Sequence, residues 1–310
     1  MAHIYIYSPS GAVRDKVAFR RGVLRLNQLG HAVEIDTDAL ARHTRFAGDD
    51  TTRLAAIHRA ASSGADVAMI SRGGYGLTRL LPSLDYKKIT KAIHKGTRFV
   101  GLSDFTAFQT ALLAKTGATS WAGPALGEDF GQAHPDDIME ACFDDMLSGQ
   151  GEGAGWRMSS ASFKALAPKR EGVWAHDAVL WGGNLSVLVS LLGTPFFPQI
   201  KGGVLFLEDI SEHPYRIERM LTQLLHAGIF HQQKAIVLGQ FTQYKLTAHD
   251  KGFTFNSVTH WLRNQLKTPV LTDLPFGHVQ TKVCLPVGKK VSLVVENREA
   301  LILWAHAGHE

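Results

Sequence analysis

The sequence predicts an α/β protein with an N-terminal open parallel sheet, flavodoxin- or Rossmann-like, followed by a mixed α+β C-terminal domain. Short apolar runs alternate with amphipathic segments along residues 1–121, as in βα units packed on a parallel sheet. The run Ala65–Ile70 has the composition of a central strand covered on both faces. Four glycines among the eight residues of Ser148–Gly155 indicate a boundary between two domains.

The first domain, residues 1–147, is expected to alternate strands and helices. A glycine at position 30 marks the expected end of the first helix, because glycine readily adopts the left-handed conformation found there. The expected strands are His3–Tyr7, Val33–Ile35, Ala65–Ile70, Arg98–Leu102 and Thr119–Trp121, and the expected helices are Arg14–Leu29, Thr51–Ser63 and Phe105–Lys115.

A linker over residues 148–170 is expected to lead into the second domain, residues 171–310. Turn glycines at 277 and 288 separate strand-rich segments near the end of this domain, which favours a mixed α+β arrangement. The expected strands are Val173–Leu180, Val204–Leu207, Ala235–Leu238, Val291–Val295 and Leu301–Trp304, with helices near Leu185–Leu192, Pro214–His226 and Thr254–Leu266.

Composition excludes several classes of protein. With 310 residues, 45% hydrophobic and 20% charged, the chain is a folded globular protein and not a disordered one. Two cysteines and no CxxC or HExxH motif predict neither a disulfide framework nor a metal site, so we expect no cofactor.

The start of the sequence lacks a signal-peptide pattern, and no apolar run approaches membrane-spanning length, which predicts a cytoplasmic protein without a membrane partner. The net charge of +5 is dispersed in basic pairs, which argues against a nucleic-acid partner.

Two segments follow strands at the edge where open α/β sheets bind ligands. Ser71–Gly76 (SRGGYG) is glycine-rich, which lets backbone N–H groups approach a ligand; the same composition also makes an ordinary tight corner. Ser103 and Asp104 lie between a strand and a helix, where a serine can act as an exposed nucleophile. The alternative is that either residue caps the helix that begins at Phe105.

A serine nucleophile requires a base and a group that orients the base. His278 follows a glycine in a predicted turn, and Glu208 ends an apolar strand. Each residue taken alone is more typical of a satisfied turn or strand end. The chain order serine, acid, histidine is found in many hydrolases, although the order differs among folds.

Six segments in the same order resemble the LD-carboxypeptidases, a serine peptidase family that includes muramoyl-tetrapeptide carboxypeptidases and microcin C self-immunity proteins. The segments span nearly the whole chain: Ser8–Gly11, Ser71–Gly76, Val100–Ala107, Gly182–Ser186, Leu205–Leu221 and Pro275–His278. The resemblance implies two domains with the active site at their interface and with no metal or other cofactor.

Position by position, the resemblance makes Ser103 the nucleophile, Glu208 the acid and His278 the base. It places the oxyanion hole at the backbone N–H groups of Gly74 and Asp104. Arg72, Gly73 and Asn184 become candidates for substrate binding. Arg72 suits a substrate carboxylate but equally suits a structural ion pair, and Asn184 has no assigned role.

The implied reaction releases D-alanine from the murein tetrapeptide L-Ala-γ-D-Glu-meso-Dap-D-Ala during peptidoglycan recycling. The resemblance also implies a homodimer whose partner is a murein peptide. One alternative is hydrolysis of peptidyl or aminoacyl nucleotides, for which Trp121 and Trp181 are potential stacking platforms. The other alternative is a protein that binds murein peptides without catalysis.

Overall fold

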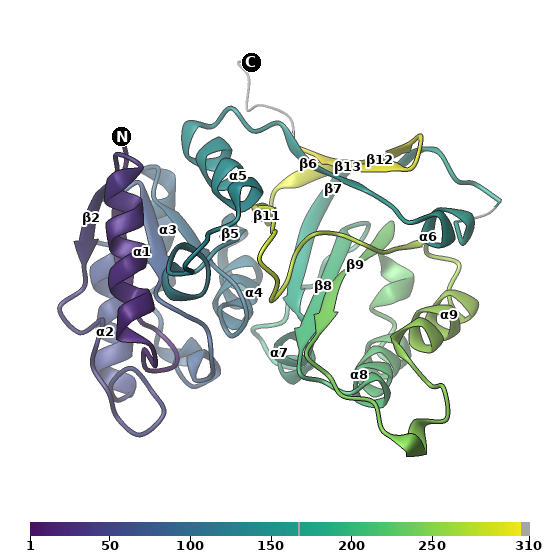
Figure 1. The fold of residues 1–310 in the computed structure, drawn as a ribbon, viewed down its shortest axis with the longest axis horizontal. Coiled ribbons are helices and arrows are strands. Elements are labelled where there is room, and N and C mark those ends of the chain that lie inside the picture. Colours follow the sequence, from purple (N-terminus) through teal and green to yellow (C-terminus); the bar gives the residue numbers. More distant parts are fainter. Residues whose placement is uncertain (167, 305–310) are drawn as a thin grey trace. The chain divides into compact units, whose positions relative to one another are not determined.

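The computed structural model describes residues 1–166 and 168–304, which form two compact units (Figure 1). The first unit contains Met1–Gln150 and two later segments, Gly193–Pro198 and Gln280–Val287. The second contains Gly151–Leu192, Gln199–Val279 and the described residues from Gly288 onward. The expected linker, residues 148–170, includes a strand at Gly153–Arg157 and a short helix at Ser160–Lys164.

The first unit has a six-stranded sheet with the order β11-β5-β4-β3-β1-β2. All pairs are parallel except β11 with β5, which is antiparallel. β3 is buried at every position and lies in the middle of the sheet, as its apolar composition predicts. The strands are β1 (His3–Tyr7), β2 (Ala32–Ile35), β3 (Val67–Ile70), β4 (Arg98–Gly101), β5 (Ser120–Ala122) and β11 (Leu285–Val287).

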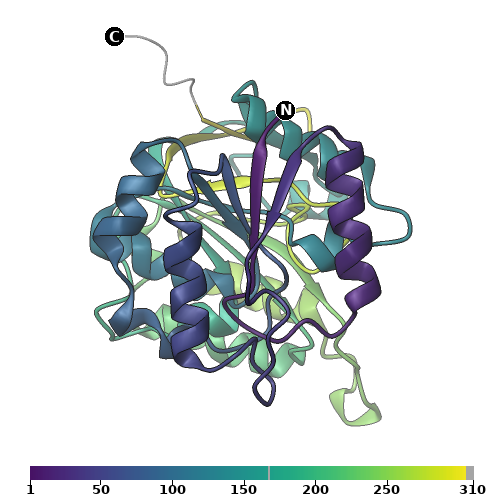
Figure 2. The same ribbon diagram turned by 90° about the vertical axis from the view of Figure 1, so that its left-hand side faces the viewer.

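Helices lie on both sides of this sheet, with α1 on one side and α2 on the other (Figure 2). A hydrophobic cluster joins residues of α1 and α5 to β1 and β3, and it includes Cys284. Both cysteines are free thiols, so no disulfide staples this unit. The helices are α1 (Lys16–Gln28), α2 (Asp50–Ala60), α3 (Tyr86–His94), α4 (Phe105–Thr116) and α5 (Asp137–Ser148), with shorter turns η1 (Leu77–Arg79), η2 (Leu81–Ser83) and η3 (Leu126–Phe130).

The second unit has a seven-stranded mixed sheet with the order β10-β9-β8-β7-β12-β13-β6. β7 to β10 are parallel, whereas β12, β13 and β6 pair antiparallel. Its strands are β6 (Gly153–Arg157), β7 (Gly172–Asn184), β8 (Val204–Ile210), β9 (Ala235–Thr242), β10 (Val270–Leu271), β12 (Lys290–Glu296) and β13 (Glu299–Leu303). Its helices are α6 (Ser160–Lys164), α7 (Leu185–Ser190), α8 (Pro214–His226) and α9 (Phe255–Gln265), with turns η4 (Phe230–Gln232) and η5 (Ala248–Asp250).

The α/β class and the mixed second sheet agree with the sequence prediction. The structure also contains parallel βα units formed by β7 to β10, which the sequence does not predict, because its strand-rich end indicates no further βα units in the second domain. Helix α5 is also absent from the sequence prediction, although Asp136 caps it and Met139, Phe143 and Met146 recur on its buried face. Strands β10 and β11 are too short to produce a periodic pattern.

A buried ion pair holds the returning segment of residues 280–287 in the first unit. Lys282 Nζ donates to Asp129 Oδ1, and both side chains are almost fully inaccessible to solvent. The second Asp129 oxygen accepts the Ala125 N–H at 2.7 Å. Burial raises the pKa of Asp129, and the Lys282 ammonium opposes that rise. The buried Lys282 ammonium therefore compensates part of the cost of burying the Asp129 carboxyl.

We expect Lys282→Met to destabilise the protein by about 3–5 kcal/mol at neutral pH, because it leaves the Asp129 charge buried and unpaired. The pKa of Asp129 in the folded state then lies further above its unfolded value. The folded variant therefore favours the protonated Asp129 carboxyl, and this contribution to stability is lost as pH rises. The loss of stability caused by Lys282→Met should consequently be larger at pH 8 than at pH 5. Guanidinium unfolding at the two pH values measures this difference. The double variant Lys282→Met/Asp129→Leu should recover most of the stability; an equally unstable double variant contradicts the expectation.

Candidate active site

Ser103 lies in a strained turn between β4 and α4. Its φ is 64°, in the left-handed region that residues other than glycine rarely adopt. The Thr106 N–H donates to the Ser103 carbonyl at 2.9 Å, and the Phe105 N–H donates to the Leu102 carbonyl at 3.2 Å. A sharp strand-to-helix turn that holds a serine in this conformation has the geometry of a nucleophile elbow.

The helix-capping alternative does not fit the side-chain bonds at this turn. Asp104 precedes α4, yet its carboxylate accepts no bond from the helix N–H groups. Asp104 Oδ2 instead accepts the Ser10 hydroxyl at 2.7 Å and the Leu77 N–H at 2.9 Å. Burial raises the pKa of Asp104, and these two bonds act in the opposite direction. Asp104 thus ties the loops that follow β1 and β3 to the start of α4.

The glycine-rich turn after β3 passes directly beside Ser103. A Cβ on Gly73 would lie 2.6 Å from Ser103 Cβ and 2.8 Å from Ser103 Oγ, so only glycine fits there. Gly74 has a φ of 118°, which also requires glycine. Within the described residues, neither the Gly74 N–H nor the Asp104 N–H donates a hydrogen bond to another group of the chain. Backbone acceptors of the described residues therefore do not occupy either donor.

A second set of polar groups lies in the other unit, at the carboxyl end of β8. Glu208 is completely buried, and its Oε2 lies 2.8 Å from Nδ1 of the half-buried His278. Because a carboxylate accepts, Nδ1 carries the proton in this pair and Nε2 is the basic nitrogen. Gly277, with a φ of 138°, precedes His278, and a Cβ there would lie 3.1 Å from Glu208 Oε2. Glycine therefore allows the close approach of the imidazole to the acid.

Asn184 links Glu208 to a second carboxylate. Its Nδ2 donates to Glu208 Oε1 at 3.1 Å and to Asp209 Oδ1 at 3.0 Å. Its Oδ1 accepts the Ser186 hydroxyl at 2.9 Å and the Val187 N–H at 3.2 Å, which caps α7. Asn184 therefore holds the acid from the side opposite His278, a role that the sequence leaves unassigned.

Asp209 is a buried polar residue of this network that sequence reasoning misses. Its carboxylate also accepts the Ser186 N–H at 2.9 Å and the Ile210 N–H at 2.8 Å. Burial, and next the neighbouring Glu208 charge, raises the pKa of Asp209 to about 6. An acidic residue directly after a strand-end glutamate is the one sequence signal that could have identified it.

The structure groups the sequence-predicted site residues into two sets. Ser103, Asp104, Gly73, Gly74 and Arg72 belong to the first unit. The second unit holds Glu208, His278 and Asn184. The bond between Glu208 and His278 agrees with the predicted acid–base pair, whereas the catalytic roles of both sets stay predictions.

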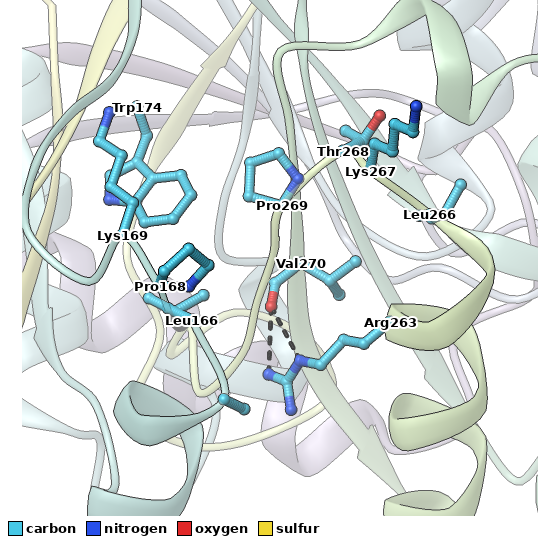
Figure 3. Close-up of a pocket in the computed structure, with 11 residues that line it drawn as sticks. Leu166, Pro168, Lys169, Trp174, Arg263, Leu266, Lys267, Thr268, Pro269 and Val270 are labelled. Carbon is cyan, nitrogen blue, oxygen red and sulfur yellow. Dashed lines mark hydrogen bonds between the residues drawn. The ribbon is translucent and has the colours of Figure 1, made fainter.

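A cavity of about 280 Å³ in the second unit contains no comparable arrangement (Figure 3). Nε and Nη2 of Arg263 both donate to the Val270 carbonyl at 3.1 Å. Lys169 Nζ lies 4.9 Å from the centre of the Trp174 ring. Among the described residues that line this cavity there is no carboxylate, histidine or serine. We therefore do not place the chemistry in this cavity.

Comparison with known proteins assigns both halves of the chain to one family. Residues 4–123 match the model of the LD-carboxypeptidase N-terminal domain, and residues 177–293 match that of the C-terminal domain. The crystal structure of muramoyltetrapeptide carboxypeptidase from Oxalobacter formigenes is similar, with a TM-score of 0.86 and 40% identity, and the alignment covers 99% of this chain and 100% of that one.

Two curated relatives extend this similarity. The probable murein peptide carboxypeptidase of Bacillus subtilis (strain 168) is 30% identical over 284 residues, which cover 90% of this chain and 85% of the relative. The microcin C7 self-immunity protein of Escherichia coli is 30% identical over 255 residues, which cover 76% of this chain and 72% of the relative.

We expect a serine-directed fluorophosphonate to label Ser103 and not the Ser103→Ala variant. Gly73→Ala should slow this labelling by at least about tenfold, because the added methyl group displaces the Ser103 side chain. The matched control is Gly123→Ala, whose methyl group would lie 3.1 Å from Val100 Cγ1 and away from Ser103. Mass spectrometry of the labelled peptide measures the rate. Equal labelling of the two glycine variants contradicts this expectation.

We also expect Glu208→Gln to lower the pKa of Asp209 from about 6, because the substitution removes the neighbouring negative charge but leaves the carboxyl buried. Titration of the Asp209 carboxyl carbon by NMR in protein labelled with ¹³C-aspartate measures the change. Glu212→Gln, on the loop after β8, serves as the control and should leave the Asp209 midpoint in place. An unchanged midpoint in Glu208→Gln shows that burial alone sets the pKa.

Proposed function

This chain belongs to the LD-carboxypeptidase family, and we propose that it is a serine carboxypeptidase that releases D-alanine from the murein tetrapeptide L-Ala-γ-D-Glu-meso-Dap-D-Ala. Family membership supports the peptidase activity, and the similarity to a muramoyltetrapeptide carboxypeptidase supports the substrate. The strained Ser103 turn, with Gly73 packed against the serine side chain, is the observation that supports a serine mechanism most directly.

In the proposed first step, Ser103 Oγ attacks the carbonyl carbon of the diaminopimelate residue, and His278 Nε2 takes the hydroxyl proton. Glu208 holds the imidazole through Nδ1 and stabilises its positive charge. The N–H groups of Gly74 and Asp104 stabilise the oxyanion, and each such donor typically contributes about 2.7–4 kcal/mol.

The tetrahedral intermediate then collapses, and the bond between the carbonyl carbon and the D-alanine nitrogen breaks. His278 gives its proton to the departing amine, which leaves an ester on Ser103. In the second half of the reaction water attacks this ester, with His278 as the base, and the tripeptide acid is released. Asn184 acts as a positioning residue that keeps Glu208 oriented toward the imidazole.

The same proposal places the enzyme in peptidoglycan recycling, as a cytoplasmic homodimer that acts on free murein peptides. The structure contributes one fact to the question of compartment. Along the described residues, none of the helices has the length and apolar character required to cross a bilayer.

Hydrolysis of peptidyl or aminoacyl nucleotides is the less supported alternative, because its expected stacking platforms are used in packing. Trp181 is completely buried, and its indole N–H donates to Gln233 Oε1 at 3.0 Å. Trp121 in β5 is half-buried against the hydrophobic cluster of the first unit. Non-catalytic peptide binding is the other alternative, and it predicts affinity for the tetrapeptide without turnover.

We expect the purified protein to release D-alanine from the tetrapeptide, and Ser103→Ala to lower kcat by at least about 10³-fold. His278→Ala and Glu208→Gln should also lower kcat strongly, because they remove the base and the charge that orients it, with little change in Tm, because Gln keeps the shape of the buried Glu208 side chain and His278 is partly exposed. Chromatography of the products measures release, and an aminoacyl nucleotide assayed in parallel separates the alternatives. Binding without release by the wild-type protein indicates a peptide-binding protein, and undiminished release by Ser103→Ala excludes the serine mechanism.

A further inference from the structure

Arg72 extends from the glycine-rich turn after β3 into a restricted space in the first unit. Its side chain is only 16% exposed. Two glycines make room for the guanidinium: a Cβ on Gly11 would overlap Arg72 Nη1, and a Cβ on Gly74 would lie 3.0 Å from it. The backbone of two loops is therefore shaped around this cation.

The Arg72 guanidinium nevertheless has few partners. Within the described residues its nearest acceptors are the Ala12 carbonyl, 3.5 Å from Nη1, and Glu128 Oε1, 3.6 Å from Nε. Both distances are long for hydrogen bonds, although a guanidinium carries five N–H donors. Burial lowers the pKa of Arg72, the Glu128 carboxylate opposes this shift, and the nearby cations Arg14 and Arg45 add to it. This half-buried cation has one carboxylate at ion-pair distance and no short hydrogen bond to an acceptor within the described residues, so it can gain from a bound anion.

Two other half-buried arginines of this unit, Arg59 and Arg25, contrast with Arg72. Arg59 makes two bonds of 2.8 Å to the Asp36 carboxylate, and Arg25 binds Glu140 through bonds of 2.7 and 2.6 Å. These are the paired contacts that guanidinium and carboxylate groups prefer. Arg72 alone among these three has no carboxylate at hydrogen-bond distance.

Arg72 also lines a cavity of about 310 Å³ that belongs entirely to the first unit. The loops after β1 and β3 border this cavity, and the chain leaves these two neighbouring strands in opposite directions, toward β2 and toward β4. Such a switch in strand order is the position at which open α/β sheets commonly bind ligands. The polar lining residues are Arg14, Asp15, Arg21, Ser71, Arg72, Glu128 and Gln132.

Arg72 and Ser103 contact consecutive residues of one turn. Gly73 lies against the Ser103 side chain, and Gly74 lies against the Arg72 guanidinium. In a peptide, the carbon of the last amide carbonyl and the carbon of the terminal carboxylate are three bonds apart, which is roughly 4 Å. A role for Arg72 at the substrate terminus therefore requires that a carboxylate bound by it brings the preceding carbonyl to Ser103, and both side chains pack against neighbouring residues of the same turn.

We propose that Arg72 binds the terminal α-carboxylate of the substrate peptide and so restricts the site to the last peptide bond. This inference rests on the function proposed above and adds the residue that recognises the end of the chain. Glu128 Oε1 lies 3.6 Å from Nε and the Ala12 carbonyl lies 3.5 Å from Nη1, and both contacts are long enough for a carboxylate to replace them at the guanidinium. A substrate whose terminus is neutral cannot use this contact.

The test compares the murein tetrapeptide with the same peptide ending in D-alaninamide. We expect the wild-type protein to prefer the free acid. Arg72→Gln should lower kcat/KM for the acid by roughly 10- to 150-fold and change it for the amide by less than about threefold. Arg72→Lys should recover part of the preference, since it keeps the charge but loses the fork. Arg20→Gln, at an exposed position of α1, is the matched control and should behave as wild type.

Calorimetric binding of both peptides to the Ser103→Ala protein separates this inference from the proposed function. Weaker binding of the acid alone after Arg72→Gln supports the carboxylate contact, even where the wild-type protein shows no hydrolysis. Turnover of acid and amide at equal rates by the wild-type protein overturns the inference and leaves the peptidase function standing. An equal loss of binding affinity for the acid and the amide peptide in Arg72→Gln also overturns it, because a general structural role of Arg72 would weaken both.

Discussion

The buried carboxylate of Asp104 is the constraint on which the geometry of the first unit depends. It accepts bonds from Ser10, in the loop after β1, and from Leu77, in the segment after β3, while its own backbone begins α4 after β4. One side chain thus joins three loops at the carboxyl edge of the sheet. Because the loops are held together, Gly73 can lie against Ser103 and the left-handed conformation of Ser103 can persist.

In the second unit a buried carboxylate likewise fixes the position of a histidine. Glu208 is buried at the end of β8 and has contacts on both carboxylate oxygens, with His278 on one and Asn184 on the other. The nearby Asp209 makes this a region of two buried acids, whose repulsion the Asn184 amide group offsets. Buried charge and strained backbone are costly for stability, and in both units they occur where the chemistry is proposed.

Arg72 shows why a buried charge has to be judged by its partners. The Lys282–Asp129 pair is buried more deeply, yet each member compensates the other, and the pair fixes a returning segment of chain. The Arg72 guanidinium packs against Gly11 and Gly74, and its acceptors, the Ala12 carbonyl and Glu128, lie at 3.5 and 3.6 Å. In the Lys282–Asp129 pair the two charges compensate each other, whereas an added anion would compensate the Arg72 charge.

The sequence alone determined the fold class, most of the elements and the residue types of the site, because these depend on local patterns of apolar residues, glycines and strand ends. Ser103 and the glycines beside it are recognisable in this way. The tertiary structure alone decided which polar groups meet. Ser10 and Asp104 are 94 residues apart, and Lys282 and Asp129 are 153 residues apart, so no local pattern connects them. For the same reason the sequence could not assign Asn184 to Glu208, place Trp181 in the core or show that Glu128 approaches Arg72 only to 3.6 Å.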